Sequence, residues 1–246
     1  MILNLLNLGR VPYAEGLELQ RRLVDAVHAG SIGNTLVLLE HPPVLTLGRN
    51  ASRAHILASD EFLAYRGVEV HEINRGGDVT YHGPGQLVGY PIFDLRSFTP
   101  RLGAVDFVRR MEEVLIRSCG DFGVPTARVQ GRTGVWTLPG GSVQEKKIAA
   151  IGVHIARGIT SHGFAFNVTA DLRDFELIVP CGIADRAVTS LELEADPAPT
   201  MEAARNSVAR QFGRVFDCHV LSVESLDALI AHAGEPAQAV TAHADL

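Results

Sequence analysis

The stretch from Arg75 to Gln86 holds the densest set of side chains that could do chemistry. Four glycines and one proline alternate there with Arg, Asp, Thr, Tyr, His and Gln. Glycine permits positive φ and lets the backbone approach another group closely, and Gly83-Pro84-Gly85 favours a turn. A bare hairpin connection needs only about two to five residues and none of these side chains. We therefore expect a long polar loop between strands at 68–74 and 87–94 that forms a binding site.

The chain has three cysteines, which are odd in number and far apart: Cys119, Cys181 and Cys218. They match neither a disulfide framework nor a paired metal site, so a reducing, cytoplasmic setting is expected. Cys119 ends an amphipathic segment and Cys218 precedes a histidine, and most such cysteines are packing residues. Cys181 lies between Pro180 and Gly182, where a constrained backbone lets a ligand approach. It is the candidate nucleophile.

A thiol with a free pKa of about 8.5 needs a cation or a base to act as a nucleophile at neutral pH. Lys147 begins an apolar strand whose next residues are small, which leaves room for a ligand or permits close packing. A desolvated lysine has a lowered pKa and can act as a base. From the spacing alone, a solvated strand-end lysine beside Lys146 is the more frequent case. The candidate activators are His82, His154, His162 and Lys147.

Periodicity predicts the elements that must position these residues. Helices are expected at 12–29, 59–65, 102–119 and 201–216, with a short one at 172–177. Strands are expected at 1–10, 35–40, 44–48, 68–74, 87–94, 126–130, 133–137, 147–155 and 162–168. The simplest description is one α/β domain (α+β type) over residues 1–233, with a small C-terminal appendage from about residue 195 as the alternative. The Ala-rich tail at 234–246 is expected to be disordered.

The bulk composition excludes several classes of protein. With 246 residues, of which 46% are apolar, the chain can bury the core of one large domain or two small ones. A net charge of −6 argues against a general nucleic-acid binder. No run of 18 apolar residues occurs, so no transmembrane helix is expected. The apolar start lacks a basic leader and a cleavage site, and is interpreted as a strand rather than a signal peptide.

Four segments together resemble the lipoyl(octanoyl) transferases, the octanoyl-[acyl-carrier-protein]–protein octanoyltransferases of lipoate biosynthesis. The segments stand in the family's order within residues 35–195: Arg75 to Leu87, Lys147-Ile148-Ala149-Ala150-Ile151-Gly152-Val153, His162-Gly163-Phe164-Ala165-Phe166-Asn167-Val168, and Pro180-Cys181-Gly182-Ile183. The resemblance implies a mixed β-sheet flanked by helices, as in the catalytic domains of biotin and lipoate protein ligases.

The resemblance also implies which residues act. Cys181 would be the acyl-carrying nucleophile, and Lys147 the residue that tunes and deprotonates it. No metal or cofactor is implied. The family's substrate pocket maps onto Arg75, Gly76, Gly77, Asp78, Val79, Thr80, Tyr81 and His82, onto Ala150, Ile151 and Gly152, and onto Gly163, Phe164 and Ala165. Backbone N–H groups near Gly76 and Gly77 are candidate donors to an oxyanion.

The implied reaction is acyl transfer through a Cys181 thioester, of the class EC 2.3.1.181. The donor would be octanoyl-acyl carrier protein, and the acceptors lysines on lipoyl domains of 2-oxoacid dehydrogenases and on the glycine cleavage H protein. Neither nucleic acid nor a membrane is an expected partner. Because these protein partners are expected to be acidic, docking would need a basic rim, for which the candidates are Arg49, Arg53, Arg75, Arg128, Arg132, Arg173 and Arg186.

Two other functions remain open at this stage. An ATP-dependent lipoate or biotin ligase on the same fold would make an acyl-adenylate, would need no cysteine, and would place Lys147 against phosphates. A non-catalytic module could instead hold a lipoyl or acyl group. Cys181 in its Pro-Cys-Gly turn favours the transferase, since neither alternative requires a thiol there.

Overall fold

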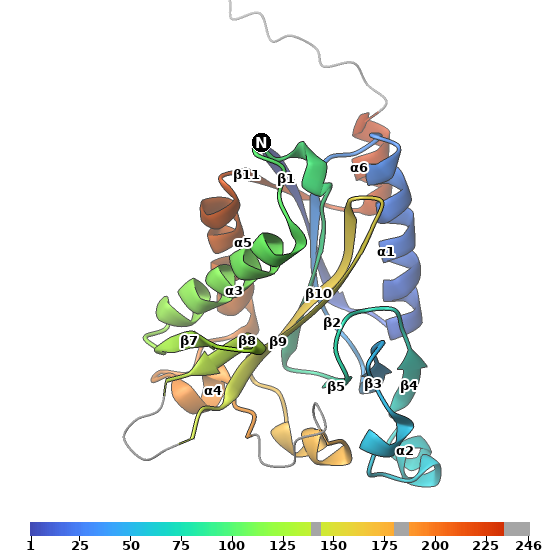
Figure 1. Cartoon of the computed structure of the whole chain (residues 1–246), viewed down its shortest axis with the longest axis vertical. Helices are drawn as coiled ribbons and strands as arrows, with labels where there is room; N and C mark the ends of the chain where they lie inside the picture. The colour runs from blue at the N-terminus through green and yellow to red at the C-terminus, as the bar shows by residue number, and fades with distance from the viewer. Residues whose placement is uncertain (139–143, 180–186, 234–246) are drawn as a thin grey trace, which may run out of the picture.

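The structure, a computed structural model, describes residues 1–138, 144–179 and 187–233. Within that part of the chain, eight strands form one mixed sheet (Figure 1). Their order across the sheet is β11 (His219–Val223), β1 (Ile2–Arg10), β2 (Thr35–Glu40), β6 (Gln86–Ile92), β10 (Ile159–Asn167), β9 (Lys147–Ala156), β8 (Arg132–Thr137) and β7 (Thr126–Val129). Strand β1 pairs in parallel with β2 and β11, and the other pairs are antiparallel.

Helices cover both faces of this sheet (Figure 1). On one face, α3 (Ala104–Gly120) and α5 (Met201–Phe216) bury apolar side chains against β6, β10 and β8. On the other face, α1 (Tyr13–His28) and α6 (Leu226–Ala233) cover β1, β2 and the outer side of β6. Leu23 and Val27 of α1 are buried one turn apart, as the apolar stripe in its sequence predicts. The predicted sheet flanked by helices is confirmed.

A second, three-stranded sheet lies at the lower right of the molecule in the view of Figure 1. Strand β3 (Val44–Leu47) is its centre, with β4 (Glu69–Glu72) in parallel and β5 (Val79–His82) antiparallel to it. Helix α2 (Asp60–Tyr65), which the Ser59 side chain caps at Phe62 N, packs Leu63 against this sheet. The 3₁₀ turns η1 (Arg53–His55) and η3 (Leu172–Leu177) close the same small core.

The expectation of one long loop between Arg75 and Gln86 is wrong in one respect. Residues 79–82 form β5, which pairs with β3. The alternation Val-Thr-Tyr-His suits a strand, but the flanking glycines suggested a loop throughout. In addition, β4 and β6 lie in different sheets, so the glycine-rich segment passes from the small sheet to the large one.

The chain beyond residue 195 is continuous with the main fold. Helix α5 packs Phe212 and Phe216 into the core that it shares with α3, and β11 extends the large sheet beside β1. The remaining short elements are η2 (Leu95–Ser97) and α4 (Leu191–Glu194). The pattern analysis missed α4, β11 and α6. No helix in the described residues has the length and hydropathy needed to cross a bilayer. The Ala-rich tail lies outside the described residues.

Candidate active site

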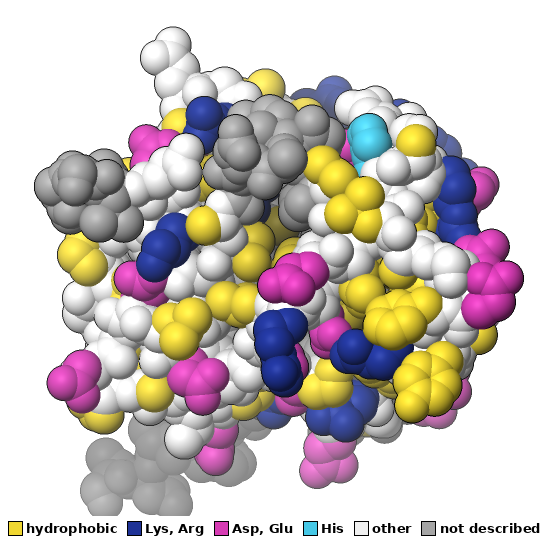
Figure 2. All heavy atoms as spheres, turned by 90° about the horizontal axis from the view of Figure 1, so that it is seen from below, with side chains coloured by type: hydrophobic (Ala, Val, Ile, Leu, Met, Phe, Trp, Pro, Cys, Tyr) yellow, Lys and Arg dark blue, Asp and Glu magenta, His cyan; other side chains and the backbone are white. Residues whose placement is uncertain are grey.

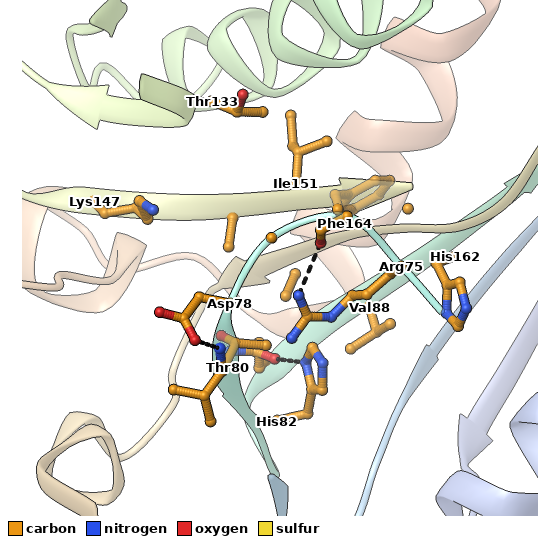
Figure 3. A pocket seen from close by; sticks show the side chains of 18 of the residues that line it. Arg75, Asp78, Thr80, His82, Val88, Thr133, Lys147, Ile151, His162 and Phe164 are labelled. Carbon is orange, nitrogen blue, oxygen red and sulfur yellow. Dashed lines mark hydrogen bonds between the residues drawn. The ribbon is translucent and has the colours of Figure 1, made fainter. Parts of the chain in front are cut away.

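A cavity of about 500 Å³ lies between the two sheets, bounded by β9 and β10 on one side and by the glycine-rich segment and β5 on the other (Figure 3). Its size is that of a small-molecule pocket. The predicted site residues that line it are Arg75, Gly76, Gly77, Asp78, Val79, Thr80, His82, Lys147, Ala150, Ile151, Gly152, Gly163, Phe164 and Ala165. Three segments that are far apart in the sequence therefore meet around one space.

Among the described residues, one predicted site residue, Tyr81, is not part of this lining. Tyr81 points the other way: its ring packs on Phe175, with ring centroids 5.6 Å apart, and its hydroxyl donates to Asp174 Oδ2 at 2.6 Å. Because β-strand side chains alternate, Thr80 and His82 face different surroundings from Tyr81. Cys181 lies outside the described residues.

Arg75 holds the glycine-rich segment in place from inside. Its side chain is buried, and its guanidinium donates to Thr46 O at 2.8 Å, to Thr46 Oγ1 at 2.9 Å and to Gly76 O at 3.0 Å. Gly48 has to be glycine here, since a Cβ at that position would lie 2.4 Å from Gly77 O. The Gly76 amide donates to Val153 O at 3.0 Å, which ties the segment to β9. The Gly76 amide is therefore engaged within the protein, and a role of the Gly77 N–H toward an oxyanion stays a prediction.

Asp78 links this segment to the small sheet. Its carboxylate accepts hydrogen bonds from His55 Nδ1 at 2.9 Å and from Val79 N at 2.7 Å (Figure 3 draws the second of these). The His55 carbonyl in turn accepts from Val179 N at 2.8 Å. His55 therefore joins Asp78 to Val179, which precedes the segment containing Cys181 in the sequence.

A chain of buried hydrogen bonds runs from His82 in the cavity through two side-chain amides to the backbone of Thr189. His82 Nδ1 donates to Gln86 Oε1 at 2.7 Å, and Gln86 Nε2 donates to Asn167 Oδ1 at 2.9 Å. Asn167 Nδ2 then donates to Thr189 O at 2.9 Å. Burial, together with nearby His41 and Arg75, lowers the pKa of His82 to about 3. The imidazole is therefore neutral at pH 7, with its proton on Nδ1.

His162 is a second neutral imidazole on the cavity wall (Figure 3). It adopts a φ of 56°, which is uncommon for a residue other than glycine. Its backbone N–H donates to Gln20 Oε1 at 2.7 Å and its Nε2 donates to Asn74 Oδ1 at 2.9 Å, and these bonds hold that conformation. Burial, followed by the charge of Arg75, lowers its pKa to about 4. His154, the third candidate histidine, does not line the cavity.

Lys147 begins β9 at one end of the cavity, and its Nζ lies 4.7 Å from the centre of the Trp136 ring. Its backbone N–H donates to Ala187 O, and its carbonyl accepts from Thr189 N, both at 3.0 Å. Residues 187–189 thus run beside Lys147 as a short parallel bridge. Residues 187–189 directly follow, in the sequence, the segment that contains Cys181.

The other two cysteines have surroundings that disfavour a thiolate. Cys119 is fully buried, and burial raises the pKa of its thiol to about 12. Burial also raises the pKa of the Cys218 thiol to about 11. A thiol with so high a pKa is almost wholly protonated at pH 7 and is a poor nucleophile.

Most of the arginines expected on a basic rim are paired with carboxylates. Arg128 bonds Glu112 and Glu113, Arg132 bonds Glu145, and Arg173 bonds Asp171. Arg53 also pairs with Asp60, although no acidic residue lies close to it in the sequence between 41 and 59. Arg75 is buried inside the cavity, and Arg186 lies outside the described residues. Figure 2 shows basic and acidic side chains interspersed on the lower face.

Sequence reasoning missed several residues of the lining, among them Tyr13, Gln86, Trp136, Asn167 and Phe175. Gln86 and Asn167 stand inside motifs that were recognised, so their polar side chains were an available signal. Tyr13 and Phe175 carried no signal, because helix α1 and the turn η3 reach the cavity only through the tertiary fold.

Comparisons with known proteins agree with this arrangement. The lipoyl protein ligase A/B catalytic domain family matches residues 12–213. An octanoyltransferase from Acidobacterium capsulatum is 75% identical over 232 residues, which cover 92% of this chain and 94% of that protein. An octanoyltransferase from Koribacter versatilis is 57% identical over 229 residues, covering 93% and 90%.

The fold is also that of a solved ligase. The crystal structure of lipoate-protein ligase A bound with ATP superposes with a TM-score of 0.71 at 16% identity, covering 95% of this chain and 93% of that one. At this identity the likeness concerns the fold alone. From the match to the family and the two curated relatives, the chain belongs to the lipoyl protein ligase A/B catalytic domain family and, within it, to the octanoyltransferases, which are acyltransferases.

Proposed function

We propose that this octanoyltransferase carries the octanoyl group on Cys181, with Lys147 as its proton carrier. The observation that supports this pairing is the position of residues 187–189 along the backbone of Lys147. Phe175 and Val188 both line the cavity, and they flank residues 180–186 in the sequence. Cys181 stands between these two lining residues in the sequence, which supports its assignment to this cavity in the proposal.

The first half of the reaction forms a thioester on the enzyme. The Cys181 thiolate attacks the carbonyl carbon of octanoyl-acyl carrier protein, and the bond between that carbon and the carrier sulfur breaks. The carrier thiolate leaves and takes a proton from the Lys147 ammonium. The products are the S-octanoyl enzyme, a neutral Lys147 and the free carrier thiol. Covalent catalysis divides a transfer between two proteins into two smaller steps.

The second half releases an amide. The ε-amine of a lysine on a lipoyl domain attacks the Cys181 thioester, and the bond between the acyl carbon and the sulfur breaks. Neutral Lys147 accepts the proton that the attacking amine loses, which regenerates the ammonium and the thiolate. We propose the lipoyl domains of 2-oxoacid dehydrogenases and the glycine cleavage H protein as acceptors. A cytoplasmic location stays a prediction from the cysteine pattern.

The apolar part of the lining suits an alkyl chain. Val88, Ile151 and Phe164 lie along the cavity beside Ala150 and Ala165. Burying a methylene contributes about 0.8 kcal/mol, so an eight-carbon chain gains several kcal/mol from this wall. The neutral imidazoles of His82 and His162 add no charge to it.

Intact-protein mass spectrometry after mixing with octanoyl-acyl carrier protein, without ATP, tests this proposal. The expected result is a gain of one octanoyl group that Cys181→Ser abolishes, while Cys119→Ser and Cys218→Ser retain it as matched controls. Loss of the adduct in Cys218→Ser, or a strict requirement for ATP, would contradict the thioester mechanism.

A further inference from the structure

The face of the Trp136 indole lies next to the ammonium group of Lys147. Nζ is 4.7 Å from the ring centroid, well within the distance of about 6 Å at which a cation is attracted to an aromatic face. Trp136 is almost completely buried and lines the cavity together with Lys147. The chain has one tryptophan, so this contact involves a chemically unique group.

The pairing of the two strands brings these side chains together. Trp136 and Lys147 are direct partners across strands β8 and β9. Gly134, two residues earlier in β8, lets β8 approach β9 closely, because a Cβ there would lie 2.6 Å from Ala149 O. Gly134 also has a φ of 118°, and its N–H donates to the buried carboxylate of Glu112 at 3.1 Å. Helix α3 thus holds β8 in the position that presents the ring.

We infer that Trp136 is a positioning residue for the acyl transfer. Its ring keeps the Lys147 side chain charged and directed along the cavity wall. This inference rests on the proposed function, in which Lys147 acts on Cys181. An ammonium gains from the ring face, whereas a neutral amine gains little. The ring therefore favours the charge state in which Lys147 stabilises a thiolate and later supplies a proton to the leaving carrier thiol.

Other charged groups near this pair also bear on the inference. The Arg132 guanidinium lies 5.6 Å from the same ring centroid, and Glu145 partly neutralises it. Lys146 pairs with Glu194. Within the cavity lining, the charged side chains besides Lys147 are Arg75, Asp78 and Arg132 among the described residues. Arg132 competes with Lys147 for the ring, so Arg132→Gln should strengthen the effect of Trp136, not abolish it.

The first test measures the reactivity of Cys181 toward iodoacetamide as a function of pH, in a background where Cys119 and Cys218 are serine. Trp136→Leu should slow alkylation at pH 7 by about 3- to 10-fold, which corresponds to the loss of a partly desolvated cation–π contact. The alkylation profile should shift to higher pH. Trp136→Phe keeps an aromatic face and should restore part of the rate.

Val135→Ala is the matched control for lost packing. Val135 is the fully buried neighbour of Trp136, and it faces the core formed by α3 and α5. Val135→Ala should lower the stability to urea but leave the pH dependence of Cys181 alkylation unchanged. An unchanged profile in Trp136→Leu, in enzyme that still forms the octanoyl adduct, would overturn the inference. If the enzyme with wild-type Cys181 and Trp136 formed no octanoyl adduct, the proposed function itself would be overturned instead.

The second test needs neither Cys181 nor turnover. Because Trp136 is the single tryptophan, its emission should change when Lys147 loses its proton at high pH. Lys147→Met, which removes the charge but keeps a similar stem, should lack that step. Identical emission titrations in the two proteins would show that the ring does not sense the lysine, and would refute the contact itself.

Discussion

The hydroxyl of Tyr81 donates a 2.6 Å hydrogen bond to Asp174, 93 residues later in the chain. Asp174 also accepts a hydrogen bond at 2.8 Å from Arg66, which follows the C-terminal end of α2. These bonds attach η3, which carries Phe175 to the cavity wall, to strand β5. Tyr81 therefore belongs to the support of the site rather than to its lining, although it stands in the middle of the substrate-binding motif.

Tyr81→Phe should accordingly act on stability before it acts on substrate binding. Removing a buried hydrogen bond to a charged acceptor should lower the free energy of unfolding by about 1–2 kcal/mol, as measured by urea unfolding. KM for octanoyl-acyl carrier protein should stay near that of the wild type. Tyr65→Phe, at a side chain that is 85% exposed, serves as the neutral control. A large rise in KM with unchanged stability would place Tyr81 in the pocket after all.

Acyl-chain length should respond to Ala150 but not to every small residue nearby. Ala150 and Ala165 line the cavity and are partners across β9 and β10, so Ala150→Leu should fill space and shift the preference to shorter chains. Ala149, the neighbour of Ala150 in β9, faces the core of α3 and α5 instead. Transfer assays over a series of acyl-carrier thioesters measure the shift, and an unaltered length profile would locate the chain elsewhere.

Gly163 should behave differently from Ala150, although both belong to the predicted substrate pocket. A Cβ at Gly163 would lie 2.1 Å from Gly89 O and 2.6 Å from Pro91 Cδ. The glycine is required by the close approach of β6 and β10, so Gly163→Ala should destabilise the fold. Thermal unfolding would detect this, whereas a shortened chain preference at unchanged melting temperature would show that the strand can move aside.

Arg49 is the remaining exposed candidate for docking an acidic carrier protein. It lies two residues after the end of β3, and no ion pair joins it to a carboxylate in the described part of the chain. Exposed charges act mostly on association rates and are screened by salt. Arg49→Glu should therefore lower kcat/KM for octanoyl-acyl carrier protein, most strongly at low salt, and leave octanoyl-CoA nearly unaffected.

Arg53→Glu is the comparison, because its charge is already balanced by Asp60. Its effect on kcat/KM for the carrier protein should be smaller than that of Arg49→Glu. Equal losses on the carrier protein and on octanoyl-CoA would mean that Arg49 acts on the cavity or on stability rather than on docking.

Acid should destabilise this protein through three buried imidazoles. Burial lowers the pKa of His41 to about 4, of His82 to about 3 and of His162 to about 4, from an ordinary value of 6.5. Below pH 6.5 these histidines bind protons in the unfolded chain but stay neutral in the folded one. The free energy of unfolding that is present above pH 6.5 is therefore lost as pH falls toward 4. Each imidazole should cost about 1–2 kcal/mol between pH 6.5 and 5.

Urea unfolding at a series of pH values checks this. His41→Gln should reduce the acid sensitivity, although it also removes the bonds of His41 Nδ1 to Val11 O at 2.7 Å and of Nε2 to Tyr90 Oη at 2.6 Å. The informative quantity is the slope of the unfolding free energy against pH, not its absolute value. A slope that is the same in the variant would assign the acid sensitivity to other groups.

The sequence by itself determined the elements whose pattern is local. The apolar stripes of α1 and α3, the Ser59 cap of α2 and the alternation along β10 each depend on neighbouring residues, and each element was predicted within a few residues. The motifs around Arg75, Lys147 and Gly163 also identified most of the cavity lining, because these short segments carry their own chemical character.

Only the tertiary structure decided which way individual side chains face and with whom they pair. Residues 79–82 form strand β5 because they pair with β3, and the glycines around them give no sign of this pairing. Tyr81 turns to Asp174 and Arg53 to Asp60 through contacts that no local pattern encodes. Trp136 meets Lys147 because a strand register sets them opposite each other. Such pairings arise from the packing of distant segments, and a one-dimensional pattern does not specify them.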